Sequence, residues 1–333
     1  MDSAELINRL LSAARVEEAK DQVLNEFSGL DLAQQYRNAF ARLLKPDPLA
    51  RVDMLGTDQR DRFVPVVREH LQKKLGLSDH VLDIGGGDGQ TFSLLADALP
   101  AGTTVSLEEP NKKYAERYWE CLGGYETLLP GDRWDCGFDD WQSYCQTEAK
   151  PSPQSVGYAV VLSIHMAYFV DNVVQALVDM ANLLKVGGSL IIIVADEADA
   201  YTGHMLRAYY SATENKLGLE ENLRLCKQRR DLLSDKALLI EELNRLCAGK
   251  QFVLQSQNQP SRLYGHSLVD MVALCNIAEL ADIDDVKKFE VAATELSTNP
   301  ELYDLTIETD SGPRYGMLSV KQPQIVTIVT RKA

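Results

Sequence analysis

The sequence predicts an α/β fold in which helices cover both faces of a mostly parallel sheet. Two observations support this prediction: short apolar segments alternate with helical patterns in the middle of the chain, and a glycine-rich turn follows the first of these segments. The predicted strands are Val81–Ile84, Thr103–Leu107, Trp134–Phe138, Tyr158–Leu162 and Ser189–Val194. Helices are predicted between them at Gln90–Leu99, Asn111–Cys121 and Val173–Leu184.

The chain before the first strand is helical in pattern. Helices are predicted over Asp31–Leu44 and Gln59–Leu75. The first of them is expected to end before Pro46, since proline cannot continue a helix, and the second ends at Gly76.

The last third of the chain is predicted to hold a helical insertion and the elements that complete the sheet. Residues Tyr201 to Lys250 have a helical pattern. The later elements are a strand at Phe252–Gln255, a helix at Leu268–Leu280 and a terminal strand at Ile325–Thr330. The chain is thus predicted to divide into an N-terminal helical region (1–76) that covers the substrate, a core (77–200), a helical cap (201–250) and a segment that completes the sheet (251–333).

Charge and composition exclude several classes of partner. The formal net charge is −15, so the chain lacks the excess of cations that binds nucleic-acid phosphates. No segment approaches the roughly 20 apolar residues of a membrane span, and the first residues lack the pattern of a signal peptide. The 6 cysteines form no CxxC pair, so no structural zinc is expected. We expect a cytoplasmic protein with no nucleic-acid partner, no membrane partner and no metal.

The strongest motif is the turn after the first predicted strand. Asp83, Gly85, Gly87 and Gly89 fill a D-x-G-x-G-x-G pattern. Glycines let such a turn adopt positive φ and let the backbone approach a ligand closely. The dinucleotide pattern G-x-G-x-x-G fails at its last position, which is Gln90, so a dehydrogenase is disfavoured.

This turn resembles that of class I S-adenosylmethionine-dependent methyltransferases. The resemblance implies a Rossmann-like sheet with an antiparallel last strand, and S-adenosylmethionine as cofactor with S-adenosylhomocysteine as product. It also implies that Asp83 and the three glycines hold the amino-acid end and ribose of the cofactor. The segment Leu183–Ile192 is similar to that family's helix, Gly-Gly turn and fifth strand.

Further cofactor residues are expected at the ends of the next strands. Glu109 lies twenty residues after Gly89, where a carboxylate can accept hydrogen bonds from both ribose hydroxyls. Strand alternation is expected to turn the neighbouring Glu108 to the opposite face. The resemblance implies that Asp139 accepts from the adenine amino group and that Phe138 lies on the ring. Ile164, which ends the fourth strand, completes the predicted cofactor set.

A closer resemblance is to the histamine N-methyltransferase-like family. It rests on Ile84–Gly89, Glu109-Pro110, the run Ile164–Val170 and the N-terminal segment Tyr36–Leu44. Where that family has a substrate-binding Gln, this sequence has His165, and Leu49 falls near the place of a substrate-binding Glu. These departures disfavour histamine itself as the substrate.

The predicted function is methyl transfer to a small molecule, on an amine or a nitrogen heterocycle. His165 and Tyr168 are the catalytic candidates, because ligands bind at the carboxyl ends of parallel strands and a histidine can take up a proton near neutral pH. Tyr36, His165, Tyr168 and Tyr201 are the substrate-binding candidates. Packing is the alternative role for each tyrosine, and a hydrogen-bonded wall residue without a catalytic role is the alternative for His165. O- or S-methylation, and a protein that binds the cofactor without catalysis, stay open. The leucine-rich helices of the cap also leave a homodimer open.

Overall fold

The computed structural model describes residues 3–43, 54–170, 172–212, 220–221, 224, 227–228, 231–233, 235–247, 249–278 and 284–332. Its contacts divide the chain into two compact units. The helical unit comprises Met1–Arg60, Asp196–Gln228 and Pro260–Gln324. The sheet unit comprises Asp61–Ala195, Arg229–Gln259 and Ile325–Ala333.

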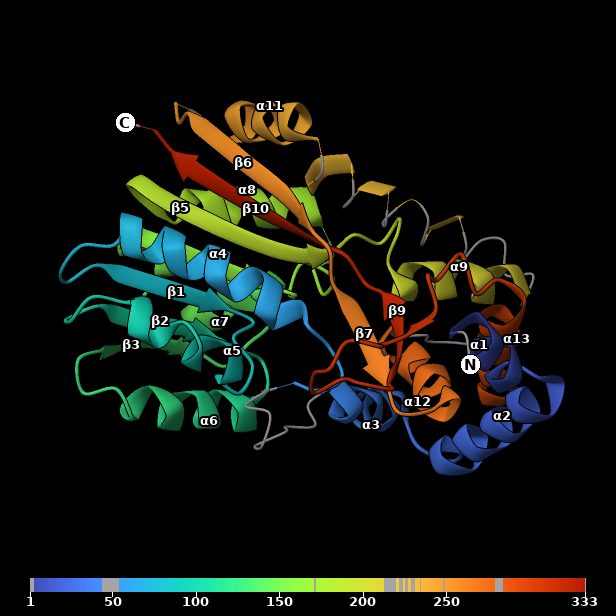
Figure 1. Ribbon diagram of the computed structural model, residues 1–333. Helices are drawn as coiled ribbons and strands as arrows, with labels where there is room; N and C mark the ends of the chain where they lie inside the picture. Colours follow the sequence, from blue (N-terminus) through green and yellow to red (C-terminus); the bar gives the residue numbers. More distant parts are fainter. Residues whose placement is uncertain are drawn as a thin grey trace. The chain divides into compact units, whose positions relative to one another are not determined.

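The sheet unit is built on a seven-stranded sheet in the order β3-β2-β1-β4-β5-β10-β6. Its strands are β1 (His80–Ile84), β2 (Thr104–Glu108), β3 (Leu129–Trp134), β4 (Tyr158–Ile164), β5 (Leu184–Ala195), β6 (Phe252–Gln259) and β10 (Gln324–Arg331). The strands from β3 to β5 pair in parallel, whereas β10 runs against β5 (Figure 1). The predicted fold class, a mostly parallel sheet with an antiparallel last strand, is confirmed.

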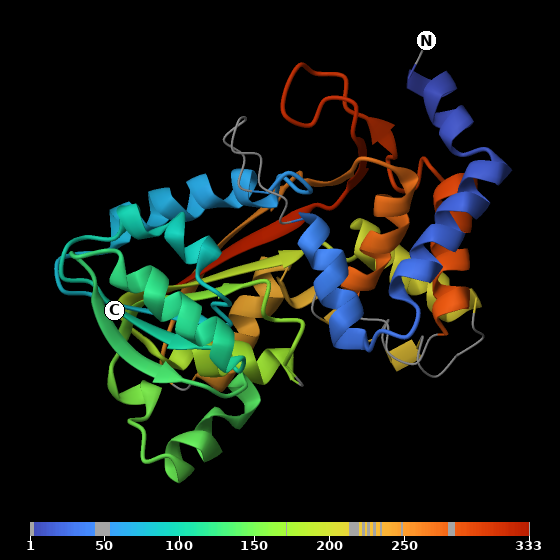
Figure 2. The same cartoon turned by 90° about the horizontal axis from the view of Figure 1, so that it is seen from below.

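Helices cover both faces of this sheet. One face packs against α4 (Gln59–Lys74), α5 (Gln90–Ser93) and α6 (Lys112–Gly123); Figure 2 shows α4, in light blue, along it. The other face packs against α7 (Trp141–Thr147), α8 (Val173–Asn182) and α11 (Lys236–Leu246). Successive residues of β1 alternate between the two apolar clusters, Val81 in the first and Leu82 in the second, as the pleat of a strand requires.

The strand order places a ligand crevice at the carboxyl end of β1. The chain leaves β1 to form β2 on one side and returns later to form β4 on the other. Open α/β sheets bind ligands at such a switch point, because the connections diverge there. The glycine turn follows β1 at this place.

Two predicted elements of the sheet unit are wrong in position. The third strand is β3, which ends at Trp134, and Phe138–Asp140 forms a 3₁₀ turn instead of its last residues. Pro130 and Gly131 are unfavourable in most strands, so the sequence pattern did not indicate one here. Strand β3 lies at the edge of the sheet, where a proline is tolerated. The helix predicted at Gln90–Leu99 is only α5, followed by a 3₁₀ turn at Ala96–Ala98.

The helical unit combines helices with a small antiparallel sheet. Its helices are α1 (Ser3–Leu10), α2 (Ala13–Phe27), α3 (Leu32–Leu43), α9 (Tyr201–Ala212), α12 (Leu268–Ala273) and α13 (Asp285–Thr298). Its strands are β7 (Arg262–Gly265), β8 (Thr306–Ile307) and β9 (Leu318–Lys321), in the order β7-β9-β8. The helix predicted at Leu268–Leu280 is α12 followed by a 3₁₀ turn at Leu274–Ala278. The helical pattern predicted before the first strand includes α1 and α2 without giving their bounds, and the sequence did not predict α13 or this sheet.

The predicted cap is shared between the two units. Helix α9 belongs to the helical unit and α11 to the sheet unit, while residues 213–219 of the predicted cap lie outside the described residues. The division of the chain by role into cover, core, cap and completion stays a prediction. No helix among the described residues is long and apolar enough to cross a membrane.

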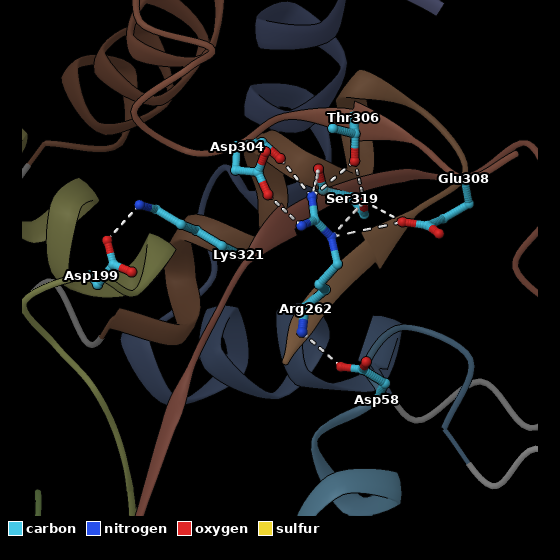
Figure 3. Close-up of polar contacts among 8 residues, drawn as sticks. All are labelled: Asp58, Asp199, Arg262, Asp304, Thr306, Glu308, Ser319 and Lys321. Carbon is cyan, nitrogen blue, oxygen red and sulfur yellow. Dashed lines mark hydrogen bonds and ion pairs between the residues drawn. The ribbon is translucent and has the colours of Figure 1, made fainter. Parts of the chain in front are cut away.

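Arg262 joins the strands of the small sheet. Its guanidinium donates to the Thr306 hydroxyl at 2.9 Å, to the Ser319 hydroxyl at 2.9 Å and to the Asp304 carboxylate at 2.5 Å (Figure 3). Its backbone N–H donates to Asp58 Oδ1 at 2.6 Å. A planar guanidinium can reach several acceptors at once, so one side chain fixes the register of β7, β8 and β9.

We predict that Arg262→Ala lowers the free energy of unfolding by about 2 kcal/mol, because it leaves partly buried acceptors without a charged donor. Arg262→Lys recovers only part of this loss, since an ammonium cannot reproduce the fork. Urea unfolding measures both variants. The matched control is Arg224→Ala, which removes an exposed arginine paired with Glu221. Equal stability of Arg262→Ala and Arg224→Ala would contradict this role.

Candidate functional site

The glycine turn needs its glycines for different reasons. Gly85, Gly87 and Gly89 have φ values of 64°, 62° and 85°, in the left-handed region that side chains rarely adopt. A Cβ atom at Gly85 would also lie 2.7 Å from Met166 Cγ, and one at Gly86 would lie 2.6 Å from Leu107 Cδ1. At Gly87 such an atom would meet nothing within 4 Å. The turn is therefore packed on two sides and open at Gly87.

Two carboxylates from the end of β2 hold the turn. The Gly85 N–H is shared between the backbone carbonyl of Glu108 at 2.8 Å and Glu108 Oε2 at 3.0 Å, and the Gly87 N–H donates to Glu109 Oε2 at 2.9 Å. Glu109 Oε1 also accepts from the N–H of Asn111, which caps α6 as expected. The expectation that alternation separates the two glutamates is wrong, because β2 ends at Glu108 and regular alternation ends with it.

A third carboxyl lies beneath the turn. Asp83 is 4% exposed and accepts a hydrogen bond from the Tyr118 hydroxyl at 3.0 Å. Burial raises the pKa of Asp83 to about 7, against the hydrogen bond from Tyr118, which lowers it. Burial likewise raises the pKa of Glu108 to about 8 and shifts the pKa of Glu109 upward. The site thus concentrates acidic groups that water cannot stabilise.

The carboxyl end of β4 lies beside the turn. His165 follows β4 with φ of 56°, and its N–H donates to the Ile193 carbonyl at 2.8 Å. The side chain of the next residue, Met166, is the one that approaches Gly85. His165 therefore sits next to the glycine turn with its backbone fixed in the left-handed region.

Aromatic rings surround His165. Its ring centroid lies 6.0 Å from that of Phe63 on α4 and 6.3 Å from that of Tyr168, whose ring is nearly parallel to it. The Tyr168 hydroxyl lies 3.5 Å from His165 Nδ1 and accepts a hydrogen bond from the Ala195 N–H at the end of β5. Phe169, 55% exposed, packs edge-on against Tyr168. These rings form an aromatic row beside the turn.

The residues after β3 approach the same sheet edge. Phe138 is half-buried and packs against Trp141 with ring centroids 5.4 Å apart, while Asp139 is exposed. The Asp139 charge contributes to the raised pKa of Glu108, which places it near that carboxyl. Ile164 is half-buried at the end of β4. Roles for these three residues in cofactor binding stay predictions.

Two predicted substrate residues belong to the helical unit. Tyr36 is half-buried on α3, with its ring stacked on Phe40 at 5.8 Å. Tyr201 is fully buried and donates to the Met271 carbonyl at 2.7 Å, which gives it a packing role, the alternative that the sequence left open. Leu49 lies outside the described residues.

Sequence reasoning missed three residues of the site. Glu108 was set aside by the alternation rule, and Phe63 and Tyr118 look like ordinary helix residues in the sequence. A pattern signal existed only for Glu108, since a glutamate that ends a buried strand is unusual. The contacts of Phe63 and Tyr118 depend on how α4 and α6 pack on the sheet.

The residues fit the cofactor that the resemblance implies. The open space at Gly87 leaves room for a ligand against the backbone. Carboxylate oxygens that already accept one hydrogen bond can accept a second from a ribose hydroxyl or an ammonium group. Among the described residues, no group of three or more His, Cys, Asp or Glu side chains is arranged to hold a metal ion.

A family model described as "Methyltransferase domain" matches residues 29–262. No curated protein matches the chain. Solved structures with similar folds include a putative methyltransferase from Bacillus halodurans, with 12% identity, a TM-score of 0.46 and coverage of 80% of this chain and 98% of that one. Another is the plantazolicin methyltransferase BamL in complex with a triazolic desmethyl analogue and S-adenosylhomocysteine, with 10% identity, a TM-score of 0.44 and coverage of 100% of both chains. Likenesses at this level carry no inference about the substrate.

We predict that Gly87→Arg abolishes binding of S-adenosylmethionine without unfolding the protein, because the new side chain enters open space at the turn. Gly187→Arg is the matched control: Gly187 has φ of 78°, also has nothing within 4 Å of its Cβ position, and lies within β5 away from the turn. Isothermal titration calorimetry measures the affinity and circular dichroism the fold. Full affinity in folded Gly87→Arg would overturn the assignment of the turn.

We also predict that the ligand-free protein loses stability as the pH rises from about 5 to about 8. The pKa values of Asp83 and Glu108 are higher in the folded state than their ordinary values of 3.8 and 4.5. The folded state therefore binds more protons in this range, and the free energy of unfolding falls by at most roughly 1.4 kcal/mol per proton and pH unit. Urea unfolding at several pH values measures the slope. A slope that stays the same in Glu108→Gln would show that this carboxyl does not cause it.

Proposed function

Since this chain belongs to the methyltransferase-domain family and is an S-adenosylmethionine-dependent methyltransferase, we propose that its acceptor is a small molecule that is methylated on an amine or ring nitrogen. The observation that carries this proposal is the position of His165. His165 follows the last residue of β4, next to Met166, which approaches the glycine turn, and it lies within a row of aromatic rings. An imidazole there can hold or remove a proton from an attacking nitrogen.

The residues of the turn position the methyl donor in this proposal. S-adenosylmethionine supplies an electrophilic methyl carbon on its sulfonium group. The backbone of Gly85 to Gly89 binds its amino-acid end, and Glu109 accepts hydrogen bonds from its ribose hydroxyls. Asp83 acts on the ammonium group, while Phe138, Asp139 and Ile164 surround the adenine. Holding donor and acceptor in one line, away from water, provides much of the rate enhancement.

The aromatic row favours an amine or a flat heterocycle as acceptor. Ring faces attract cations by about 0.5–2 kcal/mol, and they stack on flat rings. Phe63 is almost fully buried behind His165, whereas Phe169 is exposed, so Phe169 and Tyr168 are the rings that an incoming molecule can contact. The substrate-binding role predicted for Tyr36 stays a proposal.

We predict that His165→Asn leaves the affinity for S-adenosylmethionine within about three-fold and lowers turnover by roughly 100-fold or more. Asparagine tolerates the left-handed backbone of residue 165, so the substitution removes the base without straining the turn. The matched control is His266→Asn, at an exposed histidine of the helical unit, which should leave both affinity and turnover unchanged. Calorimetry gives the affinity and single-turnover kinetics the rate; unchanged turnover would remove His165 from the mechanism.

The acceptor atom is tested with deuterated methyl donor and a panel of amines, nitrogen heterocycles, phenols and thiols. Mass spectrometry and NMR locate the transferred label in the product. The proposal expects the label on nitrogen. Transfer to oxygen or sulfur alone would leave the enzyme class intact and overturn the proposed acceptor.

A further inference from the structure

A row of aligned residues that crosses the sheet near the glycine turn contains two polar side chains among apolar ones. Strand register aligns Trp134, Glu108, Ile84, Ser163 and Ile192 on neighbouring strands from β3 to β5. Aligned residues of parallel strands point to the same face, and Trp134, Ile84 and Ile192 belong to the apolar cluster beneath α7 and α8. Glu108 and Ser163 are the polar members of this row.

Both polar side chains are buried, and neither is fully used by the protein. Glu108 is 1% exposed, and its carboxylate accepts a hydrogen bond from the Gly85 N–H. Ser163 is fully buried, and among the described residues its hydroxyl has no hydrogen-bond partner. Placing an acid and an unpaired hydroxyl in an apolar row costs free energy, and proteins accept such a cost mainly at functional sites.

The groups that surround Glu108 disfavour its negative charge. Asp83 from β1, Glu109 beside it and Asp139 from the 3₁₀ turn after β3 all raise its pKa, in addition to burial. The thiol of Cys136 is close enough for Glu108 to raise its pKa as well. The hydrogen bond from the Gly85 N–H opposes this effect, and a positive charge from a ligand would favour the ionised form further.

S-adenosylmethionine carries such a charge and its product does not. The donor has an ammonium group, a carboxylate and a sulfonium, for a net charge of +1, whereas S-adenosylhomocysteine has lost the sulfonium charge and is neutral overall. We propose that Glu108 is a charge-sensing residue of the cofactor site, which loses its proton when the cationic donor binds and keeps it when the neutral product binds. This inference rests on the cofactor and is independent of the proposed acceptor.

This change in the protonation of Glu108 would favour replacement of bound S-adenosylhomocysteine by S-adenosylmethionine. A carboxylate opposite the donor adds attraction that disappears once the methyl group has left. The proton returns to Glu108 with the neutral product, so the product is held less tightly. Glu108 is thus a specificity residue that distinguishes donor from product, and its role is separate from the ribose contact of Glu109.

The test is proton-linked calorimetry on the full chain. S-adenosylmethionine and S-adenosylhomocysteine are titrated separately near pH 7, in phosphate and in Tris buffer, whose ionisation enthalpies differ. We expect binding of S-adenosylmethionine to release at least roughly half a proton more than binding of S-adenosylhomocysteine. Across a series from about pH 6 to about pH 8, the affinity for the donor relative to the product should rise several-fold.

Glu108→Gln isolates the residue. Glutamine retains the shape and accepts from Gly85 but cannot lose a proton, so the difference between the two ligands should disappear while affinity for the product stays within about three-fold. Glu120→Gln, on the exposed surface of α6, is the matched control and should behave as the native chain. Equal proton release for both ligands in the native chain, or a difference that persists in Glu108→Gln, would overturn the inference. The native-chain arm decides the question even where the variant does not fold. Binding of neither compound would instead overturn the cofactor assignment as well.

Discussion

The site depends on how the end of β2 binds the backbone N–H groups of the glycine turn. After Ile84 the chain turns away from β1. The Gly85 N–H still donates to the backbone carbonyl of Glu108 at 2.8 Å, whereas the Gly87 N–H donates to a side chain. The carboxylates of the consecutive Glu108 and Glu109 accept from the N–H groups of Gly85 and Gly87. Because β1 and β2 pair in parallel with Ile84 opposite Glu108, the two glutamates lie level with the turn that follows Ile84. The packing of Met166 against Gly85 then fixes the end of β4 to the same turn.

This solution concentrates negative charge where the fold can least stabilise it. Asp83, Glu108 and Glu109 are all buried, and burial raises the pKa of each. A protein selected only for stability would replace such groups with apolar side chains. Their presence beside open space at Gly87 is understandable if a positively charged ligand completes the site. The same carboxyls therefore link the stability of the free protein, its dependence on pH and its affinity for the methyl donor.

How far the sequence predicts this protein differs from one feature to another, for physical reasons. The glycine turn, Asp83, Glu109 and the helix cap at Asn111 were predictable, because each follows from a backbone requirement that acts within a few residues. Strand β3 was misplaced because its Pro130 and Gly131 are tolerated only by virtue of an edge position, which is a property of the whole sheet. Glu108 was missed because the alternation rule assumes that the strand continues, whereas β2 ends there.

The two halves of a methyl-transfer site differ in the same way. The donor half lies in one compact unit and is assembled from the ends of neighbouring strands, so its residues recur at spacings set by strands and turns. The acceptor half depends on individual side chains whose surroundings no local pattern determines. Tyr201 illustrates this: the sequence offers a tyrosine at a plausible place, yet its ring is fully buried and its hydroxyl is occupied by the Met271 carbonyl. His165 is the exception, because a histidine in the left-handed region at the end of β4 is fixed by the sheet itself. His165 and the aromatic row beside it are therefore the part of the acceptor site whose position the fold itself determines.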